Sequence, residues 1–193
     1  MMRDTRKIIQ ALGYLVSQQT DEKMDNMKAY KLLWLADRYH LRQYGRTITG
    51  DDYFALPYGA VPSNAKCILE EQDTKLHHCK DWVDEYLNIL PNHQYGNKKG
   101  PDMSVFSDSD IQVMNLIIEN FNHLSALELS NLSHQFPEWK HYENKLRNEN
   151  EKKSYRIDIN LFFENKEEES GLFVDDPQLL ELTKAIYQQY KGY

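Results

Sequence analysis

Three groups of residues in this sequence have side chains that bind metals or catalyse reactions in other proteins. The first is His77-His78-Cys79, with Cys67 and His93 further along the chain in either direction. Zinc ligands usually come in closely spaced pairs, whereas consecutive helical residues point about 100° apart and cannot meet at one ion. No second pair completes a ligand set. We therefore expect exposed histidines beside a buried cysteine, with no bound metal or other cofactor.

The second group is Asp37 and His40, which share one face of a helix at i, i+3 spacing. A carboxylate beside a histidine can serve acid–base catalysis, and this pair is the basis of a hydrolase hypothesis. The sequence contains no nucleophile motif and no glycine-rich phosphate loop. A helical Asp–His contact is more often structural, so we predict a protein that is not an enzyme.

The third group is Arg38, Arg42 and Arg46, which recur every four residues and form a cationic stripe along one helix face. Two interpretations are open. The stripe can be a solvated face with local salt bridges, for example to Asp51 or Asp52. It can also be a docking face for an acidic partner, with Asp37 beside it, because guanidinium groups pair bidentately with carboxylates.

The helix that carries Asp37, Arg38, His40 and Arg42 is expected to begin after Asp25 and to end at Tyr44. Asp25 is a good N-cap, and Gly45 tolerates the left-handed conformation that often follows a helix. Residues 30–36 are apolar almost all round. This composition is typical of a central helix that packs on more than one side.

A short strand and a stiff loop follow this helix. Residues 53–56 have strand-forming side chains, whereas residues 57–62 contain two prolines and a glycine and are expected to be irregular. One interpretation is a binding loop that presents Tyr53, Tyr58 and Pro62 to a partner at little entropic cost. The other is a rigid connector in which Tyr58 is buried.

Apolar periodicity and capping residues predict the remaining elements. Residues 155–163 are ambiguous, since Ile157, Ile159 and Leu161 alternate as in a strand while Asp158 can cap a short helix. A last helix begins at Pro177, with Leu182 among its inward residues. The other expected helices cover residues 5–18, 64–71 after a cap at Ser63, 75–90, 108–121, 126–134 and a segment from Pro137 onwards.

These elements predict a mainly α fold, a compact multi-helix domain with a small β-hairpin or short strands; an α+β fold is the alternative. We expect a helical domain at residues 1–147. A C-terminal extension at residues 148–193 is expected to end in a helix packed on the same domain. No apolar run approaches the roughly 20 residues that cross a membrane, no signal peptide is visible, and the two cysteines are too few for a disulfide framework. A cytoplasmic location follows.

Charge argues against a nucleic-acid partner. The net charge is -7, and residues 101–138 have the rhythm of a helix-turn-helix but contain no lysine or arginine. A recognition helix without cations would repel phosphates, which disfavours a DNA-binding autoregulator. We therefore expect a protein partner.

Several short motifs follow one another along the chain: KLLWLADRYH at residues 31–40, YGR at 44–46, ITGD at 48–51, YFALP at 53–57, GAVP at 59–62, SDSDI at 107–111 and HLSALELS at 123–130. In this order they resemble the Panacea domain, the SocA-like antitoxin domain of bacterial toxin–antitoxin systems. The resemblance covers about Lys28 to Lys140. Thr47 and Ala60 stand where that family usually has proline.

This resemblance implies a helical domain that neutralises a co-encoded protein toxin by direct contact. It also implies an alternative role, as an adaptor that delivers the toxin to a cytosolic protease. It implies no catalytic residue and no metal. We expect the partner to bind Asp37, the arginine stripe and the loop from Tyr53 to Pro62.

Overall fold

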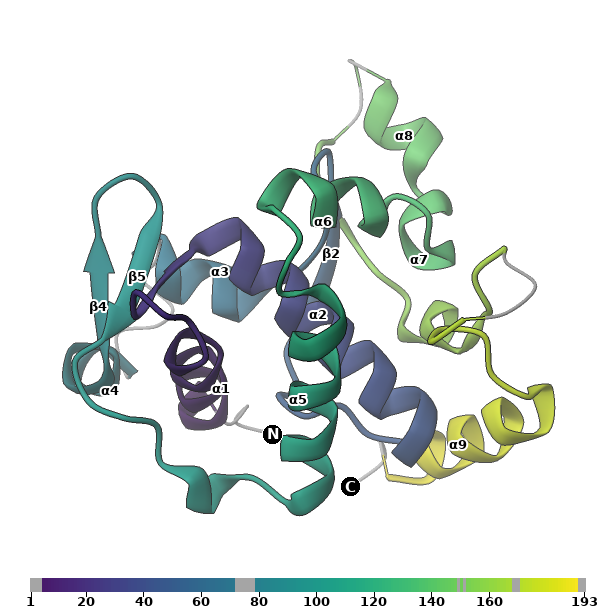
Figure 1. Ribbon diagram of the computed structural model, residues 1–193. Coiled ribbons are helices and arrows are strands. Elements are labelled where there is room, and N and C mark those ends of the chain that lie inside the picture. Colours follow the sequence, from purple (N-terminus) through teal and green to yellow (C-terminus); the bar gives the residue numbers. More distant parts are fainter. Residues whose placement is uncertain (1–4, 72–78, 149, 151, 168–170, 191–193) are drawn as a thin grey trace.

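The computed structural model describes residues 5–71, 79–148, 150, 152–167 and 171–190 (Figure 1). Helices dominate this part of the chain and two small antiparallel sheets accompany them, so the prediction of a mainly α fold is confirmed. The helices are α1 (Thr5–Ser17), α2 (Asn26–Tyr44), α3 (Ser63–Leu69), α4 (Lys80–Tyr86), α5 (Asp108–Phe121), α6 (Ala126–Ser133), α7 (Pro137–Lys140), α8 (Glu143–Arg147) and α9 (Pro177–Tyr190), with the 3-10 helices η2 (Met103–Val105) and η3 (Ile159–Phe163). The strands are β1 (Lys23–Asp25), β2 (Tyr53–Leu56), β3 (Gly59–Pro62), β4 (Leu87–Leu90), β5 (Gln94–Asn97) and β6 (Tyr155–Arg156).

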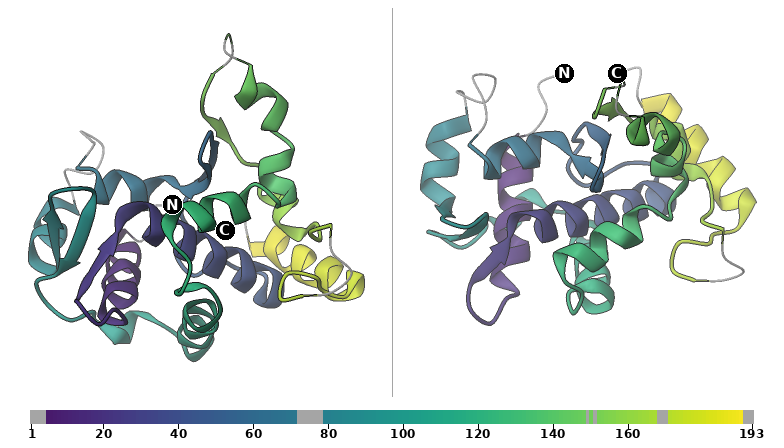
Figure 2. Two further views of the ribbon diagram at one scale, coloured as in Figure 1. Left: turned by 45° about the horizontal axis from the view of Figure 1, so that its top comes forward. Right: turned by 90° about the horizontal axis from the view of Figure 1, so that it is seen from above.

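Helix α2 runs through the middle of the molecule and contacts helices α1, α3, α5, α6 and α9. The right-hand view of Figure 2 shows α1 near one of its ends and α9 near the other. The Asp25 carboxylate accepts a hydrogen bond from the Lys28 backbone N–H at 3.0 Å, and Gly45 ends the helix with φ 69°. Leu32, Leu33, Trp34 and Leu35 are fully buried. The predicted bounds and the central position of this helix are confirmed.

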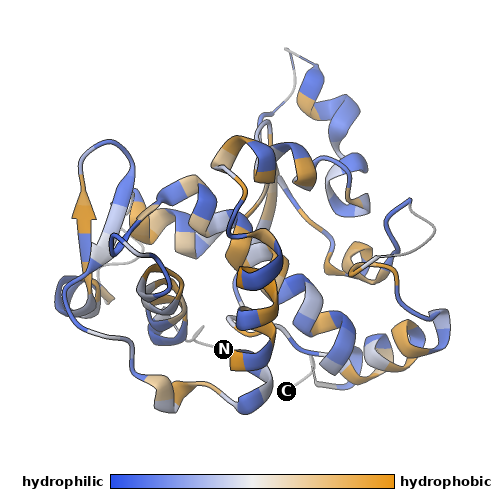
Figure 3. Ribbon diagram, viewed as in Figure 1, coloured by the Kyte–Doolittle hydropathy of each residue, from blue (hydrophilic) through white to orange (hydrophobic). Residues whose placement is uncertain are grey.

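Most helices carry both hydrophobic and hydrophilic residues (Figure 3). Ser107 and Ser125 cap α5 and α6, each in a capping box with the acidic residue three positions later. None of the helices in the described residues combines the length and the apolar character that crossing a membrane requires.

Residues 57–62 are more regular than we expected. Gly59–Pro62 forms strand β3, which pairs antiparallel with β2 in a tight hairpin, with Pro62 opposite Tyr53. The expectation of an irregular loop was wrong because β3 is the edge strand of the sheet β3-β2-β6. A proline lacks a backbone N–H, and an edge strand tolerates this at its outer side.

Two further elements differ from the sequence prediction. The helix expected at 75–90 is shorter, since α4 ends at Tyr86 and residues 87–90 form β4 in the sheet β1-β5-β4. Ser63 does not cap α3 but is its first residue. The buried Asp51 carboxylate accepts the backbone N–H groups of Asn64 and Ala65 instead, at 2.9 Å each. A cap supplied from the far side of the hairpin leaves no signal next to the helix.

The C-terminal segment packs on α2. Residues 155–163 contain both of the structures that the sequence left open, because β6 pairs with β2 and Asp158 then caps η3 through the backbone N–H of Asn160. Helix α9 lies against α2 and η3 (Figure 1). Leu182 was expected to face inward, but 60% of its surface is exposed.

The glycine at the hairpin turn is expected to be hard to replace. Gly59 has φ +98°, and a Cβ there would lie 1.8 Å from Ser133 Oγ. Gly59→Ala should therefore cost clearly more than the roughly 1–2 kcal/mol of left-handed strain alone. Gly50 is a matched control because its φ is +65° and a Cβ there would have nothing within 4 Å. Chemical denaturation of Gly59→Ala and Gly50→Ala tests this, and equal losses of stability would contradict it.

Candidate partner-binding site

Arg38 lies inside the molecule rather than on its surface. Its side chain is fully buried, and its Nε donates to Glu138 Oε1 at 2.8 Å. A second hydrogen bond reaches the Glu164 backbone carbonyl at 2.8 Å, and the guanidinium carbon lies 4.7 Å from the centre of the Phe136 ring. Burial raises the pKa of Glu138, and the charge of Arg38 opposes that rise. The pair joins α2 to α7.

Arg42 is also fully buried, and its partners come from the C-terminal segment. Its Nε donates to Asp175 Oδ2 at 2.6 Å, and its Nη1 donates to the backbone carbonyls of Phe162 and Glu164 at 2.8 Å. Nη2 donates to the side chain of Asn165. The expected cationic surface stripe is therefore incorrect for Arg38 and Arg42. The periodicity located them on one face of a helix, but it carried no information about the segment that covers that face.

Asp37 and His40 have separate structural roles. The Asp37 carboxylate accepts the backbone N–H groups of Ile48 and Thr49 at 2.8 and 2.9 Å, and burial raises its pKa to about 6. Burial lowers the pKa of His40 to about 4, so its imidazole is neutral near pH 7. Its Nδ1–H donates to the Arg46 carbonyl at 2.8 Å, and its Nε2 lies 3.0 Å from Ser109 Oγ. The two side chains fix the chain that follows α2.

Of the remaining candidate binding residues, Tyr53 and Pro62 are buried, whereas Arg46 and Tyr58 are exposed. Arg46 contacts Asp110 at 2.9 Å at the start of α5. Tyr58 lies in the hairpin turn with 69% of its surface exposed, and its carbonyl accepts from Ser130 Oγ of α6. The two exposed residues therefore lie in different parts of the surface, and the structure does not gather the seven candidates into one site.

The sequence predicted that the group around His77-His78-Cys79 binds no metal. The structure describes only some of these residues. His77 and His78 lie outside the described residues. Cys67 is half-buried and Cys79 is buried, and neither is part of a disulfide. Within the described ranges there is no group of three or more metal-ligating side chains.

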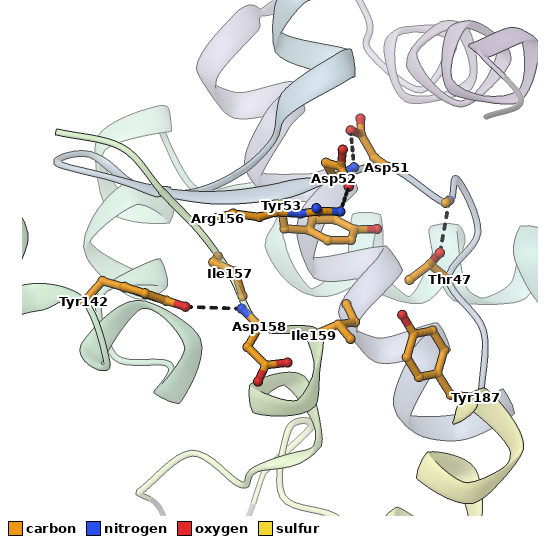
Figure 4. A pocket seen from close by; sticks show the side chains of 11 residues that line it. Thr47, Asp51, Asp52, Tyr53, Tyr142, Arg156, Ile157, Asp158, Ile159 and Tyr187 are labelled. Atoms are coloured by element: carbon orange, nitrogen blue, oxygen red, sulfur yellow. Dashed lines mark hydrogen bonds and ion pairs between the residues drawn. The ribbon is translucent and has the colours of Figure 1, made fainter. Parts of the chain in front are cut away.

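A pocket of about 580 Å³ lies where β2, β6, η3 and α9 meet, and we call it the junction pocket. Arg156 and Asp52 form an ion pair at 2.7 Å on its wall, and the Asp158 backbone N–H donates to the Tyr142 hydroxyl at 3.3 Å (Figure 4). Tyr187 of α9 contributes its ring. Nearly half of the wall comes from the C-terminal segment. The lining residues are Thr47, Gly50, Asp51, Asp52, Tyr53, Tyr142, Arg156, Ile157, Asp158, Ile159 and Tyr187.

Sequence reasoning missed Arg156, Asp158 and Tyr187 as site residues. The capping signal of Asp158 marked the start of η3, but no spacing in the sequence connects these positions to Asp52, about a hundred residues earlier. Only the pairing of β6 with β2 brings them together, with Arg156 opposite Phe54.

A buried lysine of α2 is hydrogen-bonded to the hairpin of β2 and β3. Lys31 is fully buried, and its Nζ donates to the Ala60 carbonyl at 2.8 Å. Nζ and Ser133 Oγ both lie within 2.5 Å of the position that a Cβ on Gly59 would occupy. Burial lowers the pKa of Lys31 from 10.5 to about 7. The Ala60 carbonyl of the hairpin therefore accepts a hydrogen bond from an amine whose protonated form is disfavoured by burial.

We expect Lys31 to make stability depend on pH. Between pH 7 and 10.5 the unfolded chain binds more protons than the folded one, so the contribution of Lys31 to the free energy of unfolding rises with pH. Below pH 7 both states are protonated and the contribution is constant. From pH 7 to 9.5 the free energy of unfolding of the wild type should rise relative to Lys31→Met by an amount on the order of 3 kcal/mol.

Urea denaturation of both proteins across this pH range measures the difference. The exposed Lys23 of β1 supplies the control variant, Lys23→Met, which should not show the rise. A difference between the wild type and Lys31→Met that stays constant from pH 7 to 9.5 would rule out the proposed titration.

The fold is that of a mainly helical protein in which Asp37, Arg38 and Arg42 of the central helix are buried and hydrogen-bonded to other segments of the chain. Residues 30–140 match the family described as antitoxin SocA-like, Panacea domain. This match covers more than half of the 193 residues, and the chain belongs to that family. No curated protein and no solved structure matches the chain. Membership in an antitoxin family suggests a non-enzymatic role and a toxin as the general kind of partner.

Proposed function

We propose that this protein is the antitoxin of a toxin–antitoxin pair and that it neutralises a co-encoded protein toxin by direct binding in the cytoplasm. The family match over residues 30–140 carries this proposal. The acidic net charge of -7 supports a protein partner rather than a nucleic acid, because nucleic-acid binding is driven by cations that neutralise phosphates. Arg38 and Arg42 are buried, and the Asp37 carboxylate is buried and hydrogen-bonded to the backbone. These side chains are engaged within the fold, which supports a protein that binds a partner and does not catalyse a reaction.

The test is co-expression with the neighbouring open reading frame. We expect the neighbour alone to stop growth, the pair to grow, and the two purified proteins to elute as one complex from a sizing column. A neighbour that is harmless alone, or that stays toxic without forming a complex, would contradict the proposal. The exposed control variant Lys23→Met should neutralise as the wild type does.

The same cells separate two routes to neutralisation. If the antitoxin blocks the toxin, the half-life of the toxin is unchanged or longer when both are present. If it works as an adaptor for a cytosolic protease, the half-life shortens, and deletion of the protease restores it. We propose blocking as the route.

A further inference from the structure

The junction pocket has the space, the opening and the surroundings of a binding site. Its volume of about 580 Å³ falls within the range of roughly 300–1,000 Å³ of ligand pockets. Its wall combines the family domain, through Thr47 to Tyr53, with the C-terminal segment, through Arg156 to Ile159 and Tyr187. A ligand held there would contact both parts of the chain at once.

The charges of the pocket favour a cation. Three carboxylates line it, and Arg156 is the only basic residue among its described lining residues. Asp51 is buried and committed to the start of α3. Asp52 is paired with Arg156, whereas Asp158 is exposed and its carboxylate accepts from the backbone N–H and the side-chain amide of Asn160. The excess is negative, and an anion entering the pocket would approach the exposed carboxylate of Asp158 and the partly exposed one of Asp52.

Aromatic rings complete the surroundings of these carboxylates. Tyr187 is half-buried, and Figure 4 shows its ring directed into the space beside Thr47 and Ile159. Burial raises the pKa of Tyr187, Asp158 and Asp52 raise it further, and Arg156 opposes them, so the hydroxyl lies within the field of all three charges. Aromatic faces beside carboxylates are a suitable environment for guanidinium and ammonium groups.

The resident ion pair can be opened at little cost. The Arg156 side chain is 67% exposed and that of Asp52 is 20% exposed, so water screens the pair from the Arg156 side and its net contribution to stability is small. A guanidinium from outside would therefore find one carboxylate accessible at Asp158. The Asp52 carboxylate lies on the same wall and adds a second negative charge near that guanidinium.

From these observations we propose that the junction pocket binds a basic side chain, an arginine or a lysine, of the partner protein. The inference rests on the proposed function only for the identity of that partner as the toxin. It names the chemistry of the contact: a cation on the toxin inserted between Asp52, Asp158 and the ring of Tyr187.

Acetyl-arginine amide is the probe for the pocket itself. In a titration of the full-length protein followed by amide NMR spectra, we expect shifts at Asp52, Asp158 and Tyr187, and weak or no shifts there with acetyl-glutamate amide. Asp158→Asn should weaken binding by about threefold or more. Asparagine can still cap η3, so the fold should persist. Asp84→Asn makes the same charge change on α4 and should leave the affinity unchanged.

A variant of Arg156 reverses the sign of the effect. Arg156→Gln removes the cation that competes for Asp52, so the arginine probe should bind more tightly than to the wild type. If the pocket were an anion site, the same variant would lose binding. Tighter binding of acetyl-glutamate amide than of acetyl-arginine amide, equal losses in Asp158→Asn and Asp84→Asn, or weaker arginine binding by Arg156→Gln would each overturn the inference.

Co-expression then separates the pocket from the function. The double variant Asp52→Asn/Asp158→Asn should fold, as judged by circular dichroism, and should neutralise the toxin less well than the wild type. If it neutralises equally well, the pocket inference fails while the proposed function stands. If the wild type binds the arginine probe in the pocket but does not neutralise the neighbouring gene product, the proposed function fails while cation binding stands.

Discussion

Replacing Glu138 by leucine is expected to destabilise the folded protein by roughly 3–5 kcal/mol. Arg38 and Glu138 are both fully buried and lie 2.8 Å apart. Without the carboxylate, the Arg38 guanidinium would remain charged in an apolar environment with Phe136 and Phe173 against it. The loss therefore reflects an uncompensated buried charge, not the net strength of the pair. Urea denaturation followed by circular dichroism measures it.

The double variant Arg38→Met/Glu138→Leu is the matched comparison. It removes both charges, and replacing a buried ion pair by apolar residues of similar volume is often neutral. The Glu164 carbonyl that Arg38 contacts keeps a donor, because Arg42 also reaches it at 2.8 Å. We expect the double variant to recover most of the stability that Glu138→Leu loses. A double variant at least as unstable as Glu138→Leu would show that the pair itself, and not the orphaned charge, determines the cost.

Replacing Arg42 by methionine is expected to cost about as much, roughly 3–5 kcal/mol, and to loosen the C-terminal segment first. Arg42 stays charged near pH 7, since burial and the neighbouring Arg38 lower its pKa only to about 10. It is the common donor for Asp175, Phe162 and the chain between them. Without Arg42, the Asp175 carboxylate, which is only 11% exposed, and the Phe162 carbonyl would each lose this hydrogen-bond donor.

Hydrogen exchange distinguishes this local effect from general destabilisation. Amides of α9 should exchange faster in Arg42→Met, whereas those of α1, at the other end of α2, should change less. Arg147→Met is the control because Arg147 forms an exposed i, i+4 pair with Glu143, which is worth about 0.5 kcal/mol or less. Uniform acceleration across α1 and α9 would contradict a local role for Arg42.

These two predictions concern Arg38 and Arg42, which the sequence analysis placed on the surface and which the structure shows to be buried. Regular spacing placed Arg38 and Arg42 on one helix face, which is correct, and their charge suggested that this face meets solvent or a partner. Charged residues are rarely buried unless paired, so exposure is the reasonable expectation. The pairing partners Glu138 and Asp175 lie 100 and 133 residues away, and nothing in the local sequence indicates them.

The opening segment of the family match shows what local chemistry determines. Asp25 and Gly45 defined both ends of α2, and the apolar run after Tyr30 defined its burial, because caps and periodicity act within a few residues. The capping boxes at Ser107 and Ser125 are local in the same way, since each joins residues three positions apart. The ordered motifs also indicated the antitoxin family, which the match over residues 30–140 confirms.

Interactions between distant segments required the tertiary structure. Asp51 caps α3 from outside its own sequence neighbourhood, Pro62 is accepted because β3 is an edge strand, and Lys31 supports the hairpin turn from the middle of α2. The junction pocket exists only because β6 pairs with β2 and α9 packs on α2. The sequence by itself determined α2, α5 and α6 with their caps, and the family, because these depend on neighbouring residues. The location of each charge, buried or exposed, depends on which distant segment covers it, and only the folded chain decides that.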